Sequence, residues 1–511
     1  MLDARDIKNY MEREDYVPLS YEALRRELTS SVGEYGLFAK VLGKMTKAGE
    51  VTRTSDKCYR LPKPEEFPIE PMPMAKYIIP QATGNRRGDW QLIVDRHGLR
   101  ARFPARAWEE GEAAPQAVSA ADIAGRRDLR NLRMVTIDGA DAKDLDDAIS
   151  VEALENEGLR LGVHIADVSH YVKPGSALDK EARARATSVY LLDRVLPMLP
   201  PRLSNGICSL NAGVERLAVS CCMDFDRHGA MMGYEIFKAV ICIDRRLTYD
   251  EVNRLFALPD DPEAMGEYGL LRDDLLQMKR LAESLRAQRM RRGALDFDFP
   301  ESKIIVNDEG FPLEVKRAER GAGEMLIEDF MIKANETVAQ YLRERRFPLL
   351  YRVHEPPDPE GLARLNLVLG AFALKLPTGS VPSPKDCQQI LSAIKGRPEE
   401  QTVSLMLLRS MRHACYTPAA LGHFGLASDS YCHFTSPIRR YPDLIVHRVL
   451  SSVLDNSMTA EYKKKLAAMM GELGQHCTEQ EICAEEAERD LRSMKKAQYI
   501  HQFLGEEYEA R

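Results

Sequence analysis

The 511-residue sequence has no run of about 18 uncharged apolar residues, so it offers no transmembrane helix. Its first fifteen residues, MLDARDIKNYMERED, are charged throughout and lack the apolar core of a secretory signal. The ten cysteines form no C-x-x-C pair, which argues against a zinc site and against a disulfide framework. These absences predict a cytoplasmic protein with reduced thiols and no membrane partner.

The overall composition is that of an ordinary globular protein. Hydrophobic residues make up 44% and charged residues 29%, and 71 Lys and Arg face 78 Asp and Glu for a net charge of -7. The length predicts more than one domain. The mild acidity does not exclude a nucleic-acid partner, because local patches rather than the total charge set the field.

Three segments with different patterns follow one another along the chain. Residues 1–61 carry three amphipathic stretches and an alternating tail, which predicts a winged helix-turn-helix module with Ser20 as a helix cap. A helical cap packed on the main body is the alternative. Residues 62–114 are predicted to be a linker and connecting segment, because residues 62–90 hold six prolines and two glycines. In residues 115–511 short strands rich in Val and Ile alternate with helices, and helices prevail later, which predicts an α/β (α+β) domain.

The most informative segment is TIDGADAKDLDDAIS at residues 136–150, where five aspartates fall within ten positions. Apolar stretches on both sides, MVTI and AISV, predict strands, so the carboxylates occupy a loop close to a core. At about 4 Å and an effective dielectric near 20, each pair of like charges repels by roughly 4 kcal/mol. Protons or cations must offset that repulsion, and dense carboxylate oxygens favour magnesium or manganese.

The aspartate loop has three interpretations. A calcium EF-hand loop needs glycine at its sixth position and glutamate at its twelfth, and neither register through the cluster supplies both. A solvated acidic turn is the simplest structural interpretation. A two-metal site for phosphoryl transfer is the functional one, because several carboxylates can hold two cations that stabilise the attacking and leaving oxygens. The cluster alone does not decide between the last two.

A second segment, YCHFTSPIRRYPDLIVHR at residues 431–448, combines a turn, two arginines and a predicted helix that begins near Pro442. Arginine side chains and helix N-termini both bind phosphate groups. Taken alone, such a segment is more often a surface turn whose arginines are solvated.

Together the two segments resemble the catalytic domain of the ribonuclease II and ribonuclease R family, with the match closest to ribonuclease R. The intervening motif HIADVSHYVKPGSALDKEARARATSVYLLDRVLPMLP belongs to the same resemblance, which covers roughly residues 115–505. It implies a mixed, largely antiparallel sheet surrounded by helices. It also implies a 3′→5′ exoribonuclease that hydrolyses single-stranded RNA to nucleoside 5′-monophosphates with Mg²⁺, or with Mn²⁺, by a two-metal mechanism. We expect the protein to be a monomer.

The resemblance also implies roles for individual residues. Asp138, Asp144 and Asp147 match metal ligands, and Asp146 matches the aspartate on which the chemistry depends, as a ligand or by orienting the attacking water. Asp141 is an additional residue of the loop. Arg439 matches the arginine that contacts the scissile phosphate. The predicted RNA-binding residues are Tyr190 as the clamp near the 3′ end, Phe297 as its opposite wall, Glu328 as a further carboxylate, and Arg440.

The sequence also departs from the family pattern. About 70 residues separate Leu61 from the aspartate loop, which is too few for two cold-shock domains, and the chain stops where an S1 domain would begin. Both are RNA-binding modules. An RNA-binding or regulatory protein that does not cleave is therefore one alternative. A winged-helix DNA-binding regulator is another, for which Lys40, Lys44 and Lys47 would supply basic groups.

Overall fold

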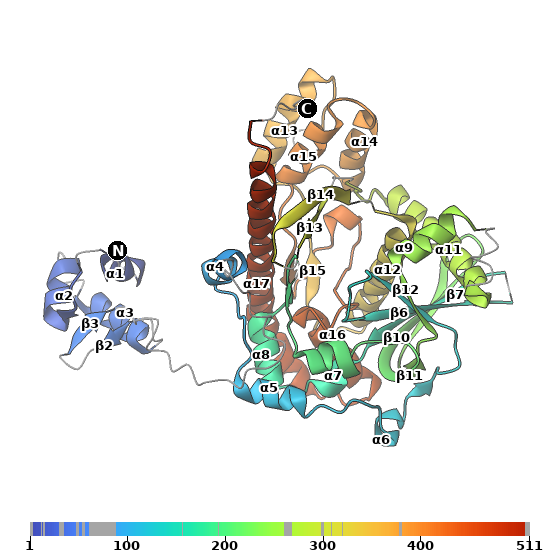
Figure 1. The fold of residues 1–511 in the computed structure, drawn as a ribbon, viewed down its shortest axis with the longest axis horizontal. Helices are drawn as coiled ribbons and strands as arrows, with labels where there is room; N and C mark the ends of the chain where they lie inside the picture. The colour runs from blue at the N-terminus through green and yellow to red at the C-terminus, as the bar shows by residue number, and fades with distance from the viewer. Residues whose placement is uncertain are drawn as a thin grey trace. The chain divides into compact units, whose positions relative to one another are not determined.

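The structure is a computed structural model that separates into two compact units, Met1–Pro80 and Gln81–Arg511 (Figure 1). It describes residues 4–11, 13, 16–29, 35–47, 51–53, 57–60, 88–155, 157–192, 194–259, 268–297, 301–307, 309–318, 320–377 and 381–505. Residues 62–87 of the predicted linker and connecting segment therefore lie outside the described residues. Within these residues, the structure has no helix both long and apolar enough to cross a membrane.

In its described residues, the first unit has three helices and a small three-stranded sheet of order β1-β3-β2. The Ser20 hydroxyl accepts a bond from the Ala23 N–H at 3.4 Å, which confirms the predicted cap. A separate apolar core that includes Leu24 and Phe38 holds the unit together. Assignment as a winged helix-turn-helix stays a prediction. The elements are α1 (Ala4–Met11), β1 (Leu19–Ser20), α2 (Tyr21–Leu28), α3 (Tyr35–Lys47), β2 (Thr52–Arg53) and β3 (Cys58–Arg60).

A seven-stranded sheet of order β12-β5-β6-β7-β10-β11-β4 is the centre of the second unit. The pairs β12–β5 and β11–β4 are parallel and the other pairs are antiparallel, so the sheet is mixed and largely antiparallel, as predicted. The strands are β4 (Arg127–Asp128), β5 (Val135–Asp138), β6 (Asp147–Ala153), β7 (Leu159–Ala166), β10 (Glu215–Phe225), β11 (Met231–Cys242) and β12 (Arg245–Thr248).

Helices pack against this sheet and extend beyond it (Figure 1). The helix α17 (Ala460–His501) runs along one side of the unit, and α13, α14 and α15 gather near its C-terminal end. Further helices are α5 (Ala105–Glu112), α6 (Ala120–Ile123), α7 (Val168–Tyr171), α8 (Ala177–Arg185), η3 (Arg202–Ile207), α9 (Tyr249–Ala257), α11 (Leu270–Arg292), α12 (Ala322–Glu344), α13 (Pro359–Ala371), α14 (Pro384–Ile394), α15 (Glu400–Ser410), η4 (Phe424–Leu426) and α16 (Tyr441–Leu454).

Within the described residues, three short strand pairs complete the second unit. The pairs join β8 (Val189–Leu191) to β9 (Arg194–Leu196), β13 (Glu301–Val306) to β14 (Pro312–Ala318), and β15 (Tyr351–Val353) to β16 (Cys415–Thr417). None of the ten cysteines of the chain forms a disulfide.

The second unit begins before the predicted boundary at residue 115. Helix α4 (Gly88–Arg96) buries Ile93 and Val94 against α17, and the Glu110 carboxylate of α5 accepts the first backbone N–H groups of α8 at 3.0 and 2.9 Å. Apolar packing and a helix-end contact thus join residues 88–114 to the large unit, although their sequence resembles a connecting segment.

A buried histidine links three adjacent strands of the sheet. His164 of β7 forms hydrogen bonds to the hydroxyls of Ser150 on β6, at 3.0 Å, and Ser220 on β10, at 2.8 Å. Burial lowers the pKa of His164 to about 4, so the ring is neutral at pH 7. Gly162 lies on the same face and leaves room for this ring, because a Cβ there would lie 2.3 Å from the Ser150 hydroxyl and 2.5 Å from His164 Nε2.

We expect Gly162→Ala to destabilise the second unit by about 1–3 kcal/mol, because the added methyl group overlaps a buried hydrogen-bonded network. Urea unfolding followed by near-ultraviolet circular dichroism measures this. Gly233→Ala on β11 is the matched control, since a Cβ there meets no atom within 4 Å. Equal stability of the two variants would contradict the steric account.

We also expect the stability contributed by His164 to depend on pH. The unfolded ring takes up a proton near pH 6.5, whereas the folded ring stays neutral down to about pH 4. The contribution is therefore complete above pH 6.5 and is lost as the pH falls toward 4, by at most about 3 kcal/mol. The stability difference between the unaltered chain and His164→Gln, measured by urea unfolding at several pH values, should shrink over this interval. A difference that is constant with pH would contradict the prediction.

Candidate active site

The loop between β5 and β6 carries the five predicted aspartates, and it is tied down by side chains from distant parts of the chain. Asp138 ends β5 and Asp147 begins β6. The Ser209 hydroxyl binds the loop backbone twice, at 3.1 and 2.8 Å. The Arg246 guanidinium donates to three carbonyls of residues 139–142 at 2.7–3.2 Å. These bonds hold the loop although its carboxylates repel one another.

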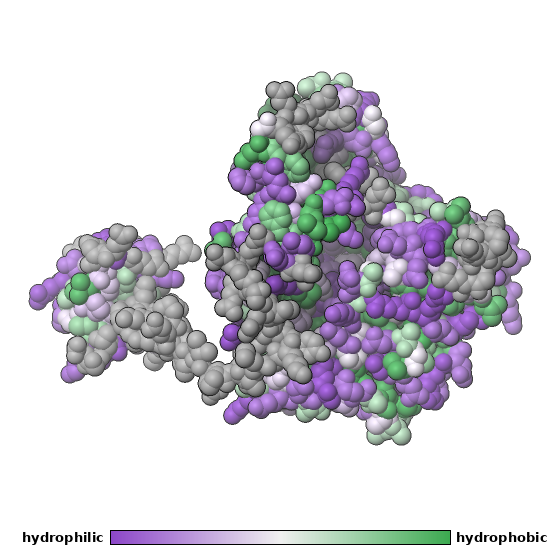
Figure 2. All heavy atoms as spheres, viewed as in Figure 1, coloured by the Kyte–Doolittle hydropathy of each residue, from purple (hydrophilic) through white to green (hydrophobic). Residues whose placement is uncertain are grey.

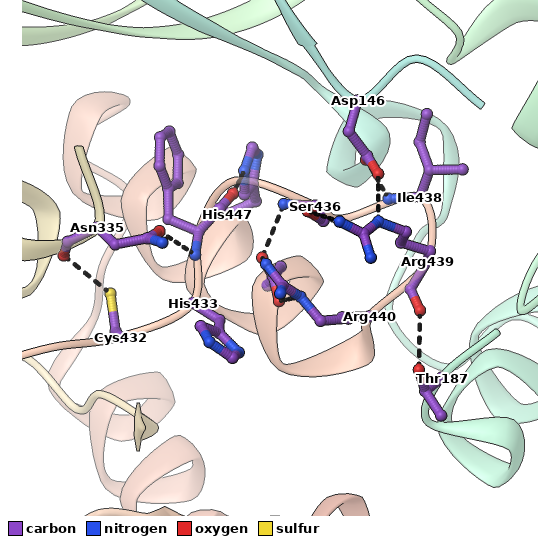
Figure 3. A network of polar contacts seen from close by, with 12 residues as sticks. Asp146, Thr187, Asn335, Cys432, His433, Ser436, Ile438, Arg439, Arg440 and His447 are labelled. Atoms are coloured by element: carbon purple, nitrogen blue, oxygen red, sulfur yellow. Dashed lines mark hydrogen bonds and ion pairs between the residues drawn. The ribbon is translucent and has the colours of Figure 1, made fainter. Parts of the chain in front are cut away.

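Asp146 is the most deeply buried of the five, with 3% of its surface exposed. Its Oδ1 accepts the Ile438 N–H at 2.8 Å, and its Oδ2 lies 3.5 Å from Arg439 Nε (Figure 3). Oδ2 is buried and has no hydrogen-bond partner. Burial raises the pKa of Asp146 well above its ordinary value, and Arg439 opposes the rise. Asp146 therefore joins the two motifs that the sequence singled out.

Three other aspartates share this environment. Burial, followed by repulsion from Asp138, raises the pKa of Asp147 to about 7. The pKa of Asp138 is also raised, first by burial and to a smaller extent by the negative charge of Asp144. Asp141 is exposed. The structure thus brings together the four aspartates that were predicted to act and leaves the fifth at the surface.

The turn of residues 435–440 carries two arginines with different surroundings (Figure 3): Arg439 faces Asp146, and Arg440 pairs with Asp443. Arg440 forms a two-bond ion pair with Asp443 at 2.8 and 2.9 Å, and Asp443 also accepts the Ser436 N–H at 2.8 Å. Asp443 is fully buried in the first turn of α16. Arg439 donates to the Ser436 hydroxyl at 3.1 Å, and 43% of its side-chain surface is exposed. Arg439 is therefore the more exposed of the two arginines and has no two-bond carboxylate partner.

Two histidines that flank the turn have structural partners (Figure 3). His447 Nε2 bonds to the Phe434 carbonyl at 2.8 Å and its ring stacks on the Phe434 ring. His433 Nδ1 bonds to the Tyr416 hydroxyl at 2.8 Å. The Phe434 N–H is bound by the Asn335 side chain at 2.8 Å. Burial lowers the pKa of both histidines, so they act as neutral hydrogen-bonding groups at pH 7.

Tyr190 reaches the site from the β8–β9 hairpin. Its hydroxyl donates to Asp144 Oδ2 at 3.1 Å. The segment just before it is joined to the arginine turn, since the Ser188 N–H donates to the Arg439 carbonyl at 2.9 Å and the Tyr441 N–H to the Ala186 carbonyl at 2.8 Å. Burial raises the pKa of Tyr190. A third segment of the chain thus meets the aspartate loop and the arginine turn.

Phe297 and Glu328 were also predicted to bind RNA, and their recorded contacts are with residues other than the aspartate loop and the arginine turn. Phe297 packs against an apolar cluster around Leu295 and Leu365. Glu328 pairs with Arg320, and Arg289 lies 3.5 Å from it. Their roles toward RNA, like that of Arg440, stay predictions.

Sequence reasoning missed Tyr249, which lies near the carboxylates. The parallel pairing of β12 with β5 places Thr248 opposite Asp138, and α9 begins at Tyr249. Burial raises the pKa of Tyr249, and the charges of Asp138 and Asp147 raise it further. The local sequence TYDE indicates only a helix start with a capping box, which the structure contains. The strand pairing that carries Tyr249 to the site leaves no local signal.

The donor set of the loop fits a hard divalent cation. Four clustered carboxylates and the unpartnered Oδ2 of Asp146 supply oxygen ligands of the kind that Mg²⁺ and Mn²⁺ prefer. Among the residues that the structure describes, no three His, Cys, Asp or Glu side chains converge closely enough to hold a metal ion. Binding a cation therefore requires some of these side chains to turn toward a common point.

Comparison with known proteins agrees with this arrangement. The RNB domain family model matches residues 126–456, which include both motifs. Ribonuclease R 1 of Lactococcus lactis subsp. lactis is 43% identical over 461 residues, which is 90% of this chain and 55% of that protein. Ribonuclease R of Thermotoga maritima is 46% identical over 423 residues, or 82% of this chain and 59% of that protein. The chain therefore spans less than two thirds of the length of these relatives.

The fold has a solved counterpart as well. The structure of Mycoplasma genitalium RNase R in complex with ribose methylated single-stranded RNA superposes with a TM-score of 0.76 and 30% identity, covering 82% of this chain and 65% of that chain. The family match extends over most of the chain, and the aspartate loop, the tyrosine hairpin and the arginine turn all lie within it. The chain belongs to the RNB domain family.

Proposed function

We propose that this chain is a 3′→5′ exoribonuclease that hydrolyses single-stranded RNA to nucleoside 5′-monophosphates with Mg²⁺ or Mn²⁺. The observation that carries the proposal is the junction at Asp146, where a buried carboxylate cluster meets the half-exposed Arg439. Carboxylates that can hold cations, next to an arginine guanidinium, suit the hydrolysis of a phosphodiester. The names of the relatives and the RNA bound to the Mycoplasma genitalium enzyme support RNA as the substrate.

Each residue has a distinct part in the proposed reaction. Bound divalent cations would supply charge neutralisation and a more acidic water, and Asp138, Asp144 and Asp147 would hold them. Asp146 would act as a ligand or orient the attacking water. Arg439 would neutralise the charge that develops on the scissile phosphate. Tyr190 would stack on the base near the 3′ end, which suits a nuclease that tolerates any sequence. No side chain needs to form a covalent intermediate.

The first prediction concerns activity. A 5′-labelled single-stranded RNA incubated with the chain and Mg²⁺ should shorten progressively from its 3′ end in a gel time course, and a matched DNA should not. EDTA should abolish the shortening, because without a bound cation the carboxylates repel the phosphate and nothing neutralises their charge. Asp146→Asn should slow it by at least roughly 10²–10³-fold, because the substitution removes a charge at the centre of the site.

Asp141→Asn is the matched control for this experiment. It changes the same residue type in the same loop at an exposed position, so the rate should stay near that of the unaltered chain. RNA that binds in a mobility-shift assay but is never shortened would contradict the proposal and favour a binding or regulatory protein.

The second prediction separates the two adjacent arginines. Arg439→Gln should reduce kcat by about 10²–10³-fold with little loss of stability, because Arg439 is half exposed and oriented toward the site. Arg440→Gln should instead destabilise the fold by about 3–5 kcal/mol, because it leaves the fully buried Asp443 without its partner. Steady-state kinetics and urea unfolding of both variants test this. Equal effects on stability, or loss of activity only in Arg440→Gln, would contradict the assignment.

A further inference from the structure

The hairpin that carries Tyr190 rests on two helices. Its apolar side chains are buried in one cluster with residues of α4 and α17. On α17 the contacting positions recur at the spacing of one helix face. The cluster contains Val189, Leu191 and Leu196 of the hairpin, Ile93 and Val94 of α4, and Ala484, Ala487 and Leu491 of α17.

Helix α4 is fastened to α17 by polar contacts as well as by this cluster. Lys495 donates to Asp89 at 2.7 Å and to the Gly310 carbonyl at 2.6 Å. His97 Nε2 lies 3.1 Å from an oxygen of Asp490. These polar contacts and the apolar cluster therefore fix α4 on α17.

Tyr190 itself is held at two points. Its hydroxyl donates to Asp144 at 3.1 Å, and its backbone N–H donates to Glu488 Oε1 on α17 at 3.0 Å. Glu488 lies next to Ala487 and one turn from Ala484, on the face of α17 that the hairpin covers. It is partly buried and touches Tyr190 through the backbone rather than through the ring.

We infer that Glu488 is a positioning residue that fixes the Tyr190 hairpin on α17 and thereby sets the point at which shortening of the RNA stops. The inference rests on the proposed function, because Tyr190 must meet the 3′ end of the substrate. Without the carboxylate, the backbone N–H of Tyr190 has to find another partner, and β8 shifts on its support. A shift of about 1 Å at a residue that aligns the reacting end can slow the reaction by about 10²-fold.

Two substitutions separate the hydrogen bond from the bulk of the side chain. Glu488→Met keeps the length but removes the acceptor, whereas Glu488→Gln retains an acceptor oxygen. With 5′-labelled RNA and Mg²⁺, Glu488→Met should leave longer final fragments and lower the single-turnover rate by about 10- to 100-fold. Glu488→Gln should retain the fragment length and the rate of the unaltered chain. If Glu488→Met does not fold, Glu488→Ala takes its place.

Controls distinguish positioning from a general loss of structure. Glu486→Met changes an exposed residue of the same helix and should alter neither the fragment length nor the rate. Because Glu488 acts through Tyr190, adding Glu488→Met to Tyr190→Ala should lengthen the fragments no further. Hydrogen exchange of a peptide that spans residues 188–192 should be faster in Glu488→Met and unchanged in Glu488→Gln.

The outcomes overturn different statements. If Glu488→Met lowers only the Tm, matches Glu488→Gln, or adds fully to Tyr190→Ala, the positioning role of Glu488 is wrong while the proposed function stands. If the unaltered chain shortens no RNA, the proposed function is wrong and the inference falls with it.

Discussion

The arrangement of the site depends on one buried carboxylate. Asp146 accepts the Ile438 N–H and faces Arg439, so segments 292 residues apart meet at a single side chain. An isolated carboxylate is costly to bury unless it is paired or protonated. The raised pKa of Asp146 reflects this cost, since Oδ1 accepts one hydrogen bond and the buried Oδ2 accepts none. The aspartate loop and the arginine turn must therefore each be held rigidly from outside the site.

That rigidity comes from groups that take no part in the proposed chemistry. Ser209 and Arg246 bind the backbone of the aspartate loop. In the segment that leads into the arginine turn, the Asn335 side chain accepts the backbone N–H of Phe434, and His447 Nε2 bonds to the Phe434 carbonyl. Polar backbone groups in both segments thus find internal partners, which allows irregular segments to lie in a buried region. The positions of Asp146 and Arg439 are therefore set by a backbone that other residues hold in place.

The sequence predicted the parts of this site that local pattern encodes. The spacing of the aspartates and the S-P-x-R-R turn are contiguous, and strands β5 and β6 follow from apolar stretches beside the loop. What the sequence could not predict depends on long-range pairing. Tyr249 reaches the site only because β12 joins β5 in parallel, and α4 joins the large unit only because its apolar face meets α17. Arg439 and Arg440 look alike in sequence, and only the buried Asp443 distinguishes them.

The difference between these two arginines has a physical basis. The ion pair of Arg440 with Asp443 is desolvated and doubly hydrogen bonded, and it closes the first turn of α16. Arg439 has no such two-bond partner, because Asp146 Oδ1 accepts the Ile438 N–H and Asp146 Oδ2 lies 3.5 Å from Arg439 Nε. A half-exposed guanidinium without a two-bond partner keeps donors for an added anion, whereas the donors of Arg440 that face Asp443 are already used. The turn therefore stabilises the fold with Arg440 and leaves Arg439 exposed for the phosphate contact that we propose.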